Sequence, residues 1–543
     1  MVPASAPALA PAPAPTPAKH GGLRATLFIN GVQALETTAI AAVGNNLITY
    51  LVNDMHYSLS KSANIVTNFV ATTFLLSILG GFLSDSYLGS FLTILIFGLI
   101  ELIGYIVIAV EAHVPSLKPE ACDVRGSVVC EEAKGVEAVL LYVGLYTIAV
   151  GSGCLKPNII AYGGDQLSCE GEANGRRAKY FNMAYLSFCV GEVIALTLLI
   201  WIQTRFGMDV GFGVSAGLML FALLILTSAT PFYLNRPPQG SIFTHILQIL
   251  VAVHKKKLEH ASNQKMLSEL SENTSRRGPE RQSLSYPDQF RYLEQGAMVE
   301  EESREVEQLK LVIRVMPIFG CTIVTNCILA QLQTFSVEQA SSMESRVAGF
   351  QVPAASVQAI PYVIMVGVVP LYVTVFVPLL RRMTGKESGI SQLQRIGIGL
   401  FVSTLSMVTA AVVESKRKAV APQKLSILWI APQFIIFGFS EMFTAVGLLE
   451  FFYSQSVAGM QSFLTALTYC SYSFGFFLSS ALVSIVNLVT KTRNQQGWLS
   501  HNNLNEDHLD LFYWLLSTVS FLNFFNYIFW SRWFKYHPSQ SQG

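Results

Sequence analysis

Long apolar stretches, separated by shorter polar segments, run along almost the whole chain. Each is close to the roughly 20 residues that a helix needs to cross the hydrocarbon core of a bilayer. Twelve of them can be counted, near residues 28–51, 64–83, 91–111, 136–162, 181–203, 211–233, 309–331, 357–380, 396–414, 425–451, 459–489 and 511–531. The pattern predicts an all-α membrane protein with twelve transmembrane helices.

One polar segment, 234–308, is much longer than the others and divides the apolar stretches into two sets of six. This arrangement predicts two six-helix bundles, over 28–233 and 309–531, around a site near the middle of the membrane. The Pro/Ala-rich residues 1–27 are expected to be disordered, and 532–543 to form a short tail.

The orientation in the membrane follows only weakly from the basic residues. Lys and Arg are almost equally divided between the short loops of the two sides, so the positive-inside rule does not decide. The central loop 234–308 carries ten Lys and Arg, which favours placing it and both termini in the cytoplasm.

Composition agrees with a membrane protein and narrows its function. Only 13% of the 543 residues are charged, against about 25% in soluble domains. The net charge of +1 indicates neither a nucleic-acid partner nor a polybasic membrane-surface segment. The chain has no Walker A, HExxH or GxSxG motif, so we expect no enzyme, no cofactor and no ATP-driven pump. A secondary transporter, a channel or a receptor remains.

Ionisable residues inside the apolar stretches are the best functional candidates, because a charge is expensive in lipid. They are Glu36, Glu101, Lys156, Glu192, Arg314, Glu441 and Glu450. Glu101 suits a helix–helix hydrogen bond, Glu192 suits either packing or a transport pathway, and the residues near span ends can reach the interface.

Lys156 and Glu441 form the most informative pair. They lie at comparable depth in opposite halves, so they could associate when one side of the protein closes and separate when it opens. The alternative is that the two side chains are buried independently.

Several segments, taken in order, resemble the plant nitrate/peptide transporter family, the proton-dependent oligopeptide branch of the major facilitator superfamily. They are "LGGFLSDSYLGSFLT" (79–93), "GSGCLKPNIIAYGGDQ" (151–166), "YFNMAYLSFCVGE" (180–192), "AQLQTFSVEQ" (330–339), "LQRIGIGL" (393–400) and the segment around Glu441. The resemblance implies cytoplasmic termini and assigns Gly81 and Asp85 to fixing the cytoplasmic end of the bundle. "QALE", "NNLITYL" and "SLSKSANIVTNF" are most similar to the subfamily with carriers of nitrate, abscisic acid and gibberellin.

The first apolar stretch departs from the family pattern Glu-x-x-Glu-Arg. Here the three positions are Gln33, Glu36 and Thr37. Because peptide-transporting relatives use the arginine to hold peptide ends, the resemblance argues against peptide substrates. A buried Glu36 without a neighbouring arginine is protonated more readily, so it is our expected proton site. Hydrogen bonding within the bundle is the other interpretation of Glu36.

Two further family positions bear on substrate and regulation. The nitrate-carrying prototype has a histidine where this chain has Leu329, and Thr93 stands at its regulatory phosphothreonine without the preceding arginine. Thr93 is therefore a candidate phosphosite. Lys156, with pocket donors such as Gln331, is expected to bind or gate the substrate.

We therefore expect a plasma-membrane secondary transporter that moves a small anion by alternating access, with protons as a possible second partner. Nitrate is the first candidate, and a carboxylate hormone (abscisic acid or gibberellin) is the alternative. A nitrate sensor with little flux is a rival from another class.

Cys122 and Cys130 flank "DVRGSVV" in a loop that is extracellular in this orientation, where a disulfide can persist. A bridge between them and two free thiols remain open alternatives. Most of the other cysteines are single residues in apolar stretches and are expected to be small buried hydrophobes.

Overall fold

A computed structural model describes most of the chain. The described residues are 21–57, 59–119, 131–167, 173–238, 300–347, 350–352, 354–385, 389–421, 423–456, 460–491, 497–499, 504–505 and 507–534. The candidate disulfide between Cys122 and Cys130 lies outside them, as do residues 1–20, 239–299 and 535–543.

The N-terminal half of the described chain consists of helices α1 to α8, which we call the N half. Its helices are α1 (Leu23–Asn53), α2 (Leu59–Leu75), α3 (Ser77–Leu83), α4 (Ser90–His113), α5 (Val136–Asp165), α6 (Ala173–Ile194), α7 (Ile200–Phe206) and α8 (Met208–Ser228). A short π-helical segment, η1 (Ser84–Leu88), follows α3, and another, η3 (Ala195–Leu199), joins α6 to α7.

The C half follows residue 299. Its helices are α11 (Glu300–Ser341), α12 (Ile360–Leu371), α13 (Val377–Thr384), α14 (Gln392–Val420), α15 (Ala431–Gln455), α16 (Gln461–Thr490) and α17 (Leu509–Trp533). The 3-10 segment η6 (Ala354–Ala359) precedes α12, and two short strands, β1 (Arg346–Val347) and β2 (Phe350–Gln351), pair antiparallel beside it.

Twelve stretches of the described residues are helical, long and apolar enough to cross a membrane, which confirms the predicted fold class. Some spans consist of more than one helix. In the span Ser356–Thr384, Pro370 lacks the N–H that a continuous helix requires, and the π-helical segment η7 (Tyr372–Phe376) follows it. A proline-linked π turn of this kind bends a helix without unfolding it.

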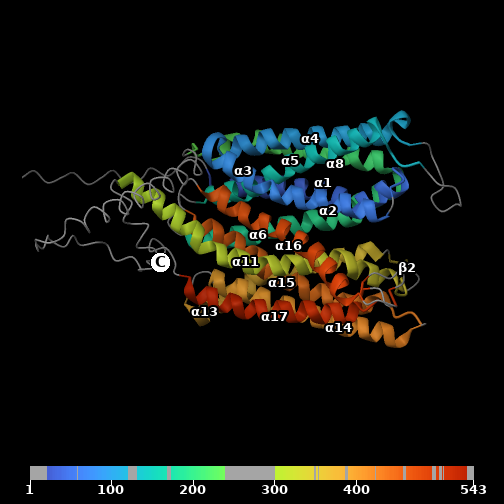
Figure 1. Cartoon of the computed structure of the whole chain (residues 1–543). Coiled ribbons are helices and arrows are strands. Elements are labelled where there is room, and N and C mark those ends of the chain that lie inside the picture. Colours follow the sequence, from blue (N-terminus) through green and yellow to red (C-terminus); the bar gives the residue numbers. More distant parts are fainter. Residues whose placement is uncertain are drawn as a thin grey trace, which may run out of the picture.

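The two halves lie side by side, with α6 and α16 between them (Figure 1). α16 packs against α2, α3 and α5 of the N half, while α6 packs against α12 and α15 of the C half. Each half therefore places one helix against the other, and these two helices form much of the interface.

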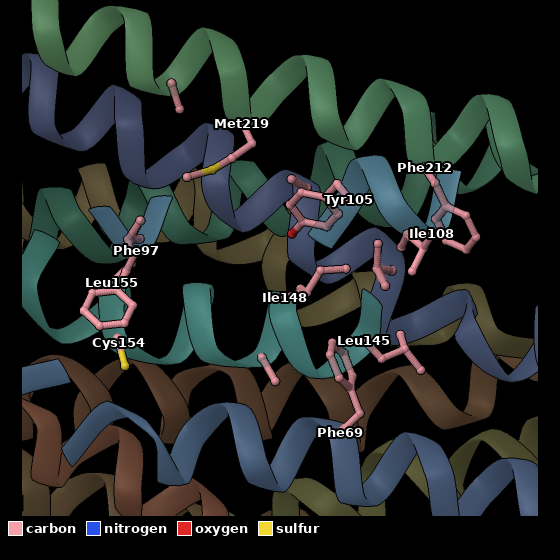
Figure 2. Packing of buried hydrophobic residues seen from close by; sticks show 14 of the residues in the cluster. Phe69, Phe97, Tyr105, Ile108, Leu145, Ile148, Cys154, Leu155, Phe212 and Met219 are labelled. Atoms are coloured by element: carbon pink, nitrogen blue, oxygen red, sulfur yellow. The ribbon is translucent and has the colours of Figure 1, made fainter. Parts of the chain in front are cut away.

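The N half has a continuous apolar core between α4, α5 and α8. Figure 2 shows Tyr105, Ile108, Leu145 and Ile148 interdigitating there, with Phe212 beside them. All five are at most 1% exposed. Such close packing makes each half a stiff unit that can move against the other as a body.

The two halves are in direct polar contact at the end where α1 begins and α8 ends, which we call the linker end. Asp85 of η1 accepts hydrogen bonds from the backbone N–H groups of Phe463 (2.8 Å) and Ser462 (3.3 Å). These are N–H groups of the first turn of α16, which have no partner inside the helix. The carboxylate also interacts favourably with the dipole of α16.

Gly81 permits this contact, because a Cβ atom there would lie 2.7 Å from the backbone oxygen of Ser462. A second contact joins the halves nearby. The Tyr453 hydroxyl donates to Asp165 Oδ1 at 2.7 Å, and Arg236 Nη1 lies 3.2 Å from the same oxygen. The structure is therefore closed at the linker end.

We expect Gly81→Ala to weaken closure of the linker end, because the added methyl group meets backbone rather than a flexible side chain. Gly44→Ala is the matched control, since a Cβ atom at Gly44 has no heavy atom within 4 Å. Both changes raise helix propensity by about 1 kcal/mol. Any difference between the two variants is therefore due to the contact of residue 81 with the backbone of Ser462.

The measurement is the distance between spin labels on Tyr87→Cys and Met383→Cys, two exposed positions of the N and C halves. A longer-distance population that appears with Gly81→Ala and not with Gly44→Ala is the expected result. Identical distance distributions in the two variants would contradict the assignment.

Candidate functional site

A largely buried ion pair joins α1 and α5 inside the N half, with the Lys156 side chain 13% exposed. Lys156 Nζ lies 2.6 Å from Glu36 Oε1 and 2.9 Å from Oε2. Glu36 is 1% exposed. The Ser152 hydroxyl, one helical turn before Lys156, donates to Oε1 at 2.7 Å. The carboxylate thus has three polar contacts in a region of low dielectric, as a buried charge requires.

Local sequence explains why α5 can carry this site. Gly151 allows close packing, because a Cβ atom there would lie 2.5 Å from the backbone nitrogen of Glu101 on α4. Pro157 follows Lys156 directly within the helix and removes one backbone hydrogen bond. Small residues and a proline therefore bring backbone and side-chain donors of α5 close to α1 and α4.

Lys156 forms its ion pair with Glu36 and not with Glu441 in this conformation. The sequence identified all three residues but did not identify this contact. The sequence signal for this contact is the depth of the two residues. Both Glu36 and Lys156 lie well inside their spans, in antiparallel helices of one half. Association of Lys156 with Glu441 stays a prediction for another conformation.

Glu441 lies on a cavity of about 40 Å³ between the two halves. Glu192 of α6 lines the same cavity from the N half. The remaining lining residues are Asn45, Leu329, Leu332, Gln333, Gln358, Pro361, Tyr362, Phe434 and Phe437. The site therefore offers two carboxyl groups, three carboxamides and several apolar surfaces, with room for a few water molecules or a small ion.

Sequence reasoning placed Gln331 in the pocket, but the structure places it elsewhere. Its Nε2 donates to Ser479 Oγ of α16 at 2.6 Å, and the side chain is fully buried between α11 and α16. Gln333, two residues further along α11, lines the cavity, as does Leu329. A substrate-binding role for Gln331 stays a prediction that this geometry does not favour.

The other ionisable candidates lie away from the cavity. Glu101 is fully buried and accepts a hydrogen bond from Tyr105 at 2.8 Å, in keeping with a helix–helix role. Glu450 Oε2 lies 3.8 Å from Arg395 Nη1.

Thr93 has no exposed surface, and its hydroxyl donates to Gly89 O at 2.9 Å. Phosphorylation of Thr93 would therefore require the start of α4 to open.

Two halves with six candidate membrane spans each, and a cavity between them lined by two buried carboxyl groups, are the arrangement of a membrane transporter. Residues 91–499 match the family model described as the POT family, and the chain belongs to this family. Proteins of this family are membrane transporters rather than enzymes, and the chain is a multi-pass member of it.

Two curated relatives from Arabidopsis thaliana are similar over almost their whole length. The chain is 55% identical to Protein NRT1/ PTR FAMILY 4.4 over 542 residues, covering 96% of this chain and 89% of that protein. It is 53% identical to Protein NRT1/ PTR FAMILY 4.3, covering 95% of this chain and 90% of that protein.

The fold is similar to that of the POT family transporter PepTSo. The TM-score is 0.62 at 19% identity, covering 94% of this chain and 98% of that one. A peptide transporter POT solved in complex with sulfate has a TM-score of 0.60 at 15% identity, covering 94% of each chain. These likenesses confirm the predicted architecture.

Glu36→Ala is expected to destabilise the protein by roughly 3–5 kcal/mol, because it leaves the largely buried Lys156 ammonium without a counter-charge. The double variant Glu36→Ala/Lys156→Ala should recover most of that loss, since it leaves no uncompensated charge. The measurement is thermal unfolding of the detergent-purified protein.

Lys61→Ala is the control, because it breaks an exposed ion pair of 2.8 Å with Glu132 and should cost at most about 1 kcal/mol. Equal losses for Glu36→Ala and Lys61→Ala would show that the Lys156–Glu36 pair is not buried as described.

Proposed function

We propose that this transporter carries a small anion, with nitrate as the first candidate, by alternating access coupled to protons at Glu36. The observation that carries the proposal is the ion pair between Lys156 and Glu36. In this conformation the Glu36 carboxylate is the counter-charge of the Lys156 ammonium. A proton on Glu36 removes that counter-charge and leaves a buried cation able to accept an anion.

Electroneutrality explains how such a pair couples two fluxes. With Glu36 ionised and no substrate, Lys156 and Glu36 together are neutral. With Glu36 protonated and an anion on Lys156, the local charge is again neutral. The other two states are ionised Glu36 with a bound anion and protonated Glu36 without an anion. Each leaves one charge uncompensated in a low-dielectric region, which is strongly unfavourable. Proton and anion therefore bind together and leave together.

The size and lining of the cavity bear on the substrate. A volume of about 40 Å³ leaves room for a small ion such as nitrate, but neither Lys156 nor Glu36 is among the residues that line this cavity, so an anion would have to move from it to reach Lys156. The specific observation in favour of a carboxylate hormone is the apolar part of the lining, formed by Leu329, Leu332, Phe434 and Phe437. A hormone would require the cavity to widen along this surface, so abscisic acid or gibberellin is the second candidate.

The residue at position 37 favours an anionic substrate over a peptide, because this chain has a threonine where peptide-carrying relatives have an arginine. Thr37 is buried, and the neighbouring Thr38 hydroxyl donates to Ala34 O at 2.8 Å within α1. Neither side chain can hold a peptide carboxylate as a guanidinium would. The plasma membrane is the proposed location, and a sensor with little flux is the rival.

Uptake of labelled nitrate, abscisic acid and gibberellin into oocytes at two external pH values tests the proposal. We expect nitrate uptake to rise at the lower pH. Glu36→Gln should remove this pH dependence yet retain exchange of labelled for unlabelled substrate at equal pH, because a glutamine cannot release Lys156 by protonation.

Glu111→Gln is the control, since Glu111 is fully buried but bound to Tyr50 on α1 at 2.7 Å and absent from the cavity lining. Binding without measurable uptake would support the sensor instead. Nitrate uptake that is indifferent to external pH and to a protonophore would exclude coupling.

A further inference from the structure

Two carboxyl groups face one cavity from opposite halves of the protein. Glu192 comes from α6 of the N half, and Glu441 from α15 of the C half. Glu441 is only 5% exposed, and its Oε2 has no hydrogen-bond partner among the residues that the structure describes. Buried polar atoms normally have a hydrogen-bond partner. A carboxylate oxygen that is buried on a cavity lining and lacks such a partner therefore indicates that a ligand binds there.

Among the described residues, no cation is paired directly with Glu192 or Glu441. The charged and titratable groups that act on Glu192 or Glu441 are Glu36, Lys156, Tyr185, Cys189, Tyr362 and Tyr472. Lys156 is the one cation among them, and Glu36 already holds it at 2.6 Å. None of the residues that line the cavity is lysine or arginine.

Two carboxylates in one buried site do not both remain ionised, because their repulsion and the loss of solvation favour keeping a proton on one of them. We propose that Glu192 and Glu441 form a second proton-binding site, separate from Glu36, that bridges the two halves. The carboxamides of Asn45, Gln333 and Gln358 are present on the same lining to donate to the carboxylate oxygens.

A site that spans the interface connects protonation to movement. When both carboxyl groups are ionised, they repel and separate α6 from α15. When they share a proton, a short hydrogen bond between carboxyl and carboxylate draws the halves together. Protonation also lowers the negative charge that an entering anion meets. The inference extends the proposed function to a second coupled proton, but proton binding itself can be measured without any substrate.

The experiment records transient charge movements after voltage steps in oocytes that express the full chain, without substrate, over a range of external pH. The wild type should titrate in two steps. Glu36→Gln and the double variant Glu192→Gln/Glu441→Gln should each retain one step, and the triple variant none. Glu192→Asp should preserve both steps, because it keeps the carboxyl group.

Three results would overturn the inference: complete loss of pH dependence in Glu36→Gln alone, an unchanged titration in Glu192→Gln/Glu441→Gln, or charge movement that disappears when choline replaces sodium. The last would make the pair a metal-cation site. A titration unaffected by Glu36→Gln but reduced by Glu192→Gln/Glu441→Gln would instead reject Glu36 as the proton site and leave this inference standing. Surface biotinylation normalises all variants for protein at the membrane.

Discussion

The high free energy of an unpaired charge in a low-dielectric region is the constraint on which the rest of this structure depends. Lys156 can lie inside the N half only because Glu36 faces it from α1. That contact requires α1, α4 and α5 to approach closely, which Gly151 permits against the backbone of Glu101. The packing of the half and the chemistry of its site thus have one origin.

The interface between the halves is asymmetric along the membrane normal. At the linker end, side chains of one half bind groups of the other directly, as Asp85 does with the first turn of α16. Further along, Phe74 of α2 stacks on Tyr472 of α16, with ring centroids 5.2 Å apart. Among the described residues, no comparable direct bond crosses the cavity beside Glu441. This asymmetry is what an alternating-access protein closed at one end requires.

Hydropathy predicted the twelve spans because each must independently satisfy its backbone hydrogen bonds and its apolar surface in lipid. Partners across helices were harder to predict, since one sequence contains no distances between spans. Lys156 was therefore identified without its contact to Glu36. Gln331 and Gln333 show the limit within one helix: two residues turn by about 200°, so the first faces α16 and the second the cavity.

The position of each acid relative to the interface decides what its protonation can do. Glu36 and Lys156 belong to the same half, so a proton on Glu36 changes the charge available to a substrate but does not by itself alter the separation of the halves. Glu192 and Glu441 belong to different halves, so a proton between them acts on that separation directly. On the proposals above, one acid site governs binding and the other governs closure. Coupling requires both, because a carrier that closes without its full set of partners dissipates its gradient, and one that binds without closing transports nothing.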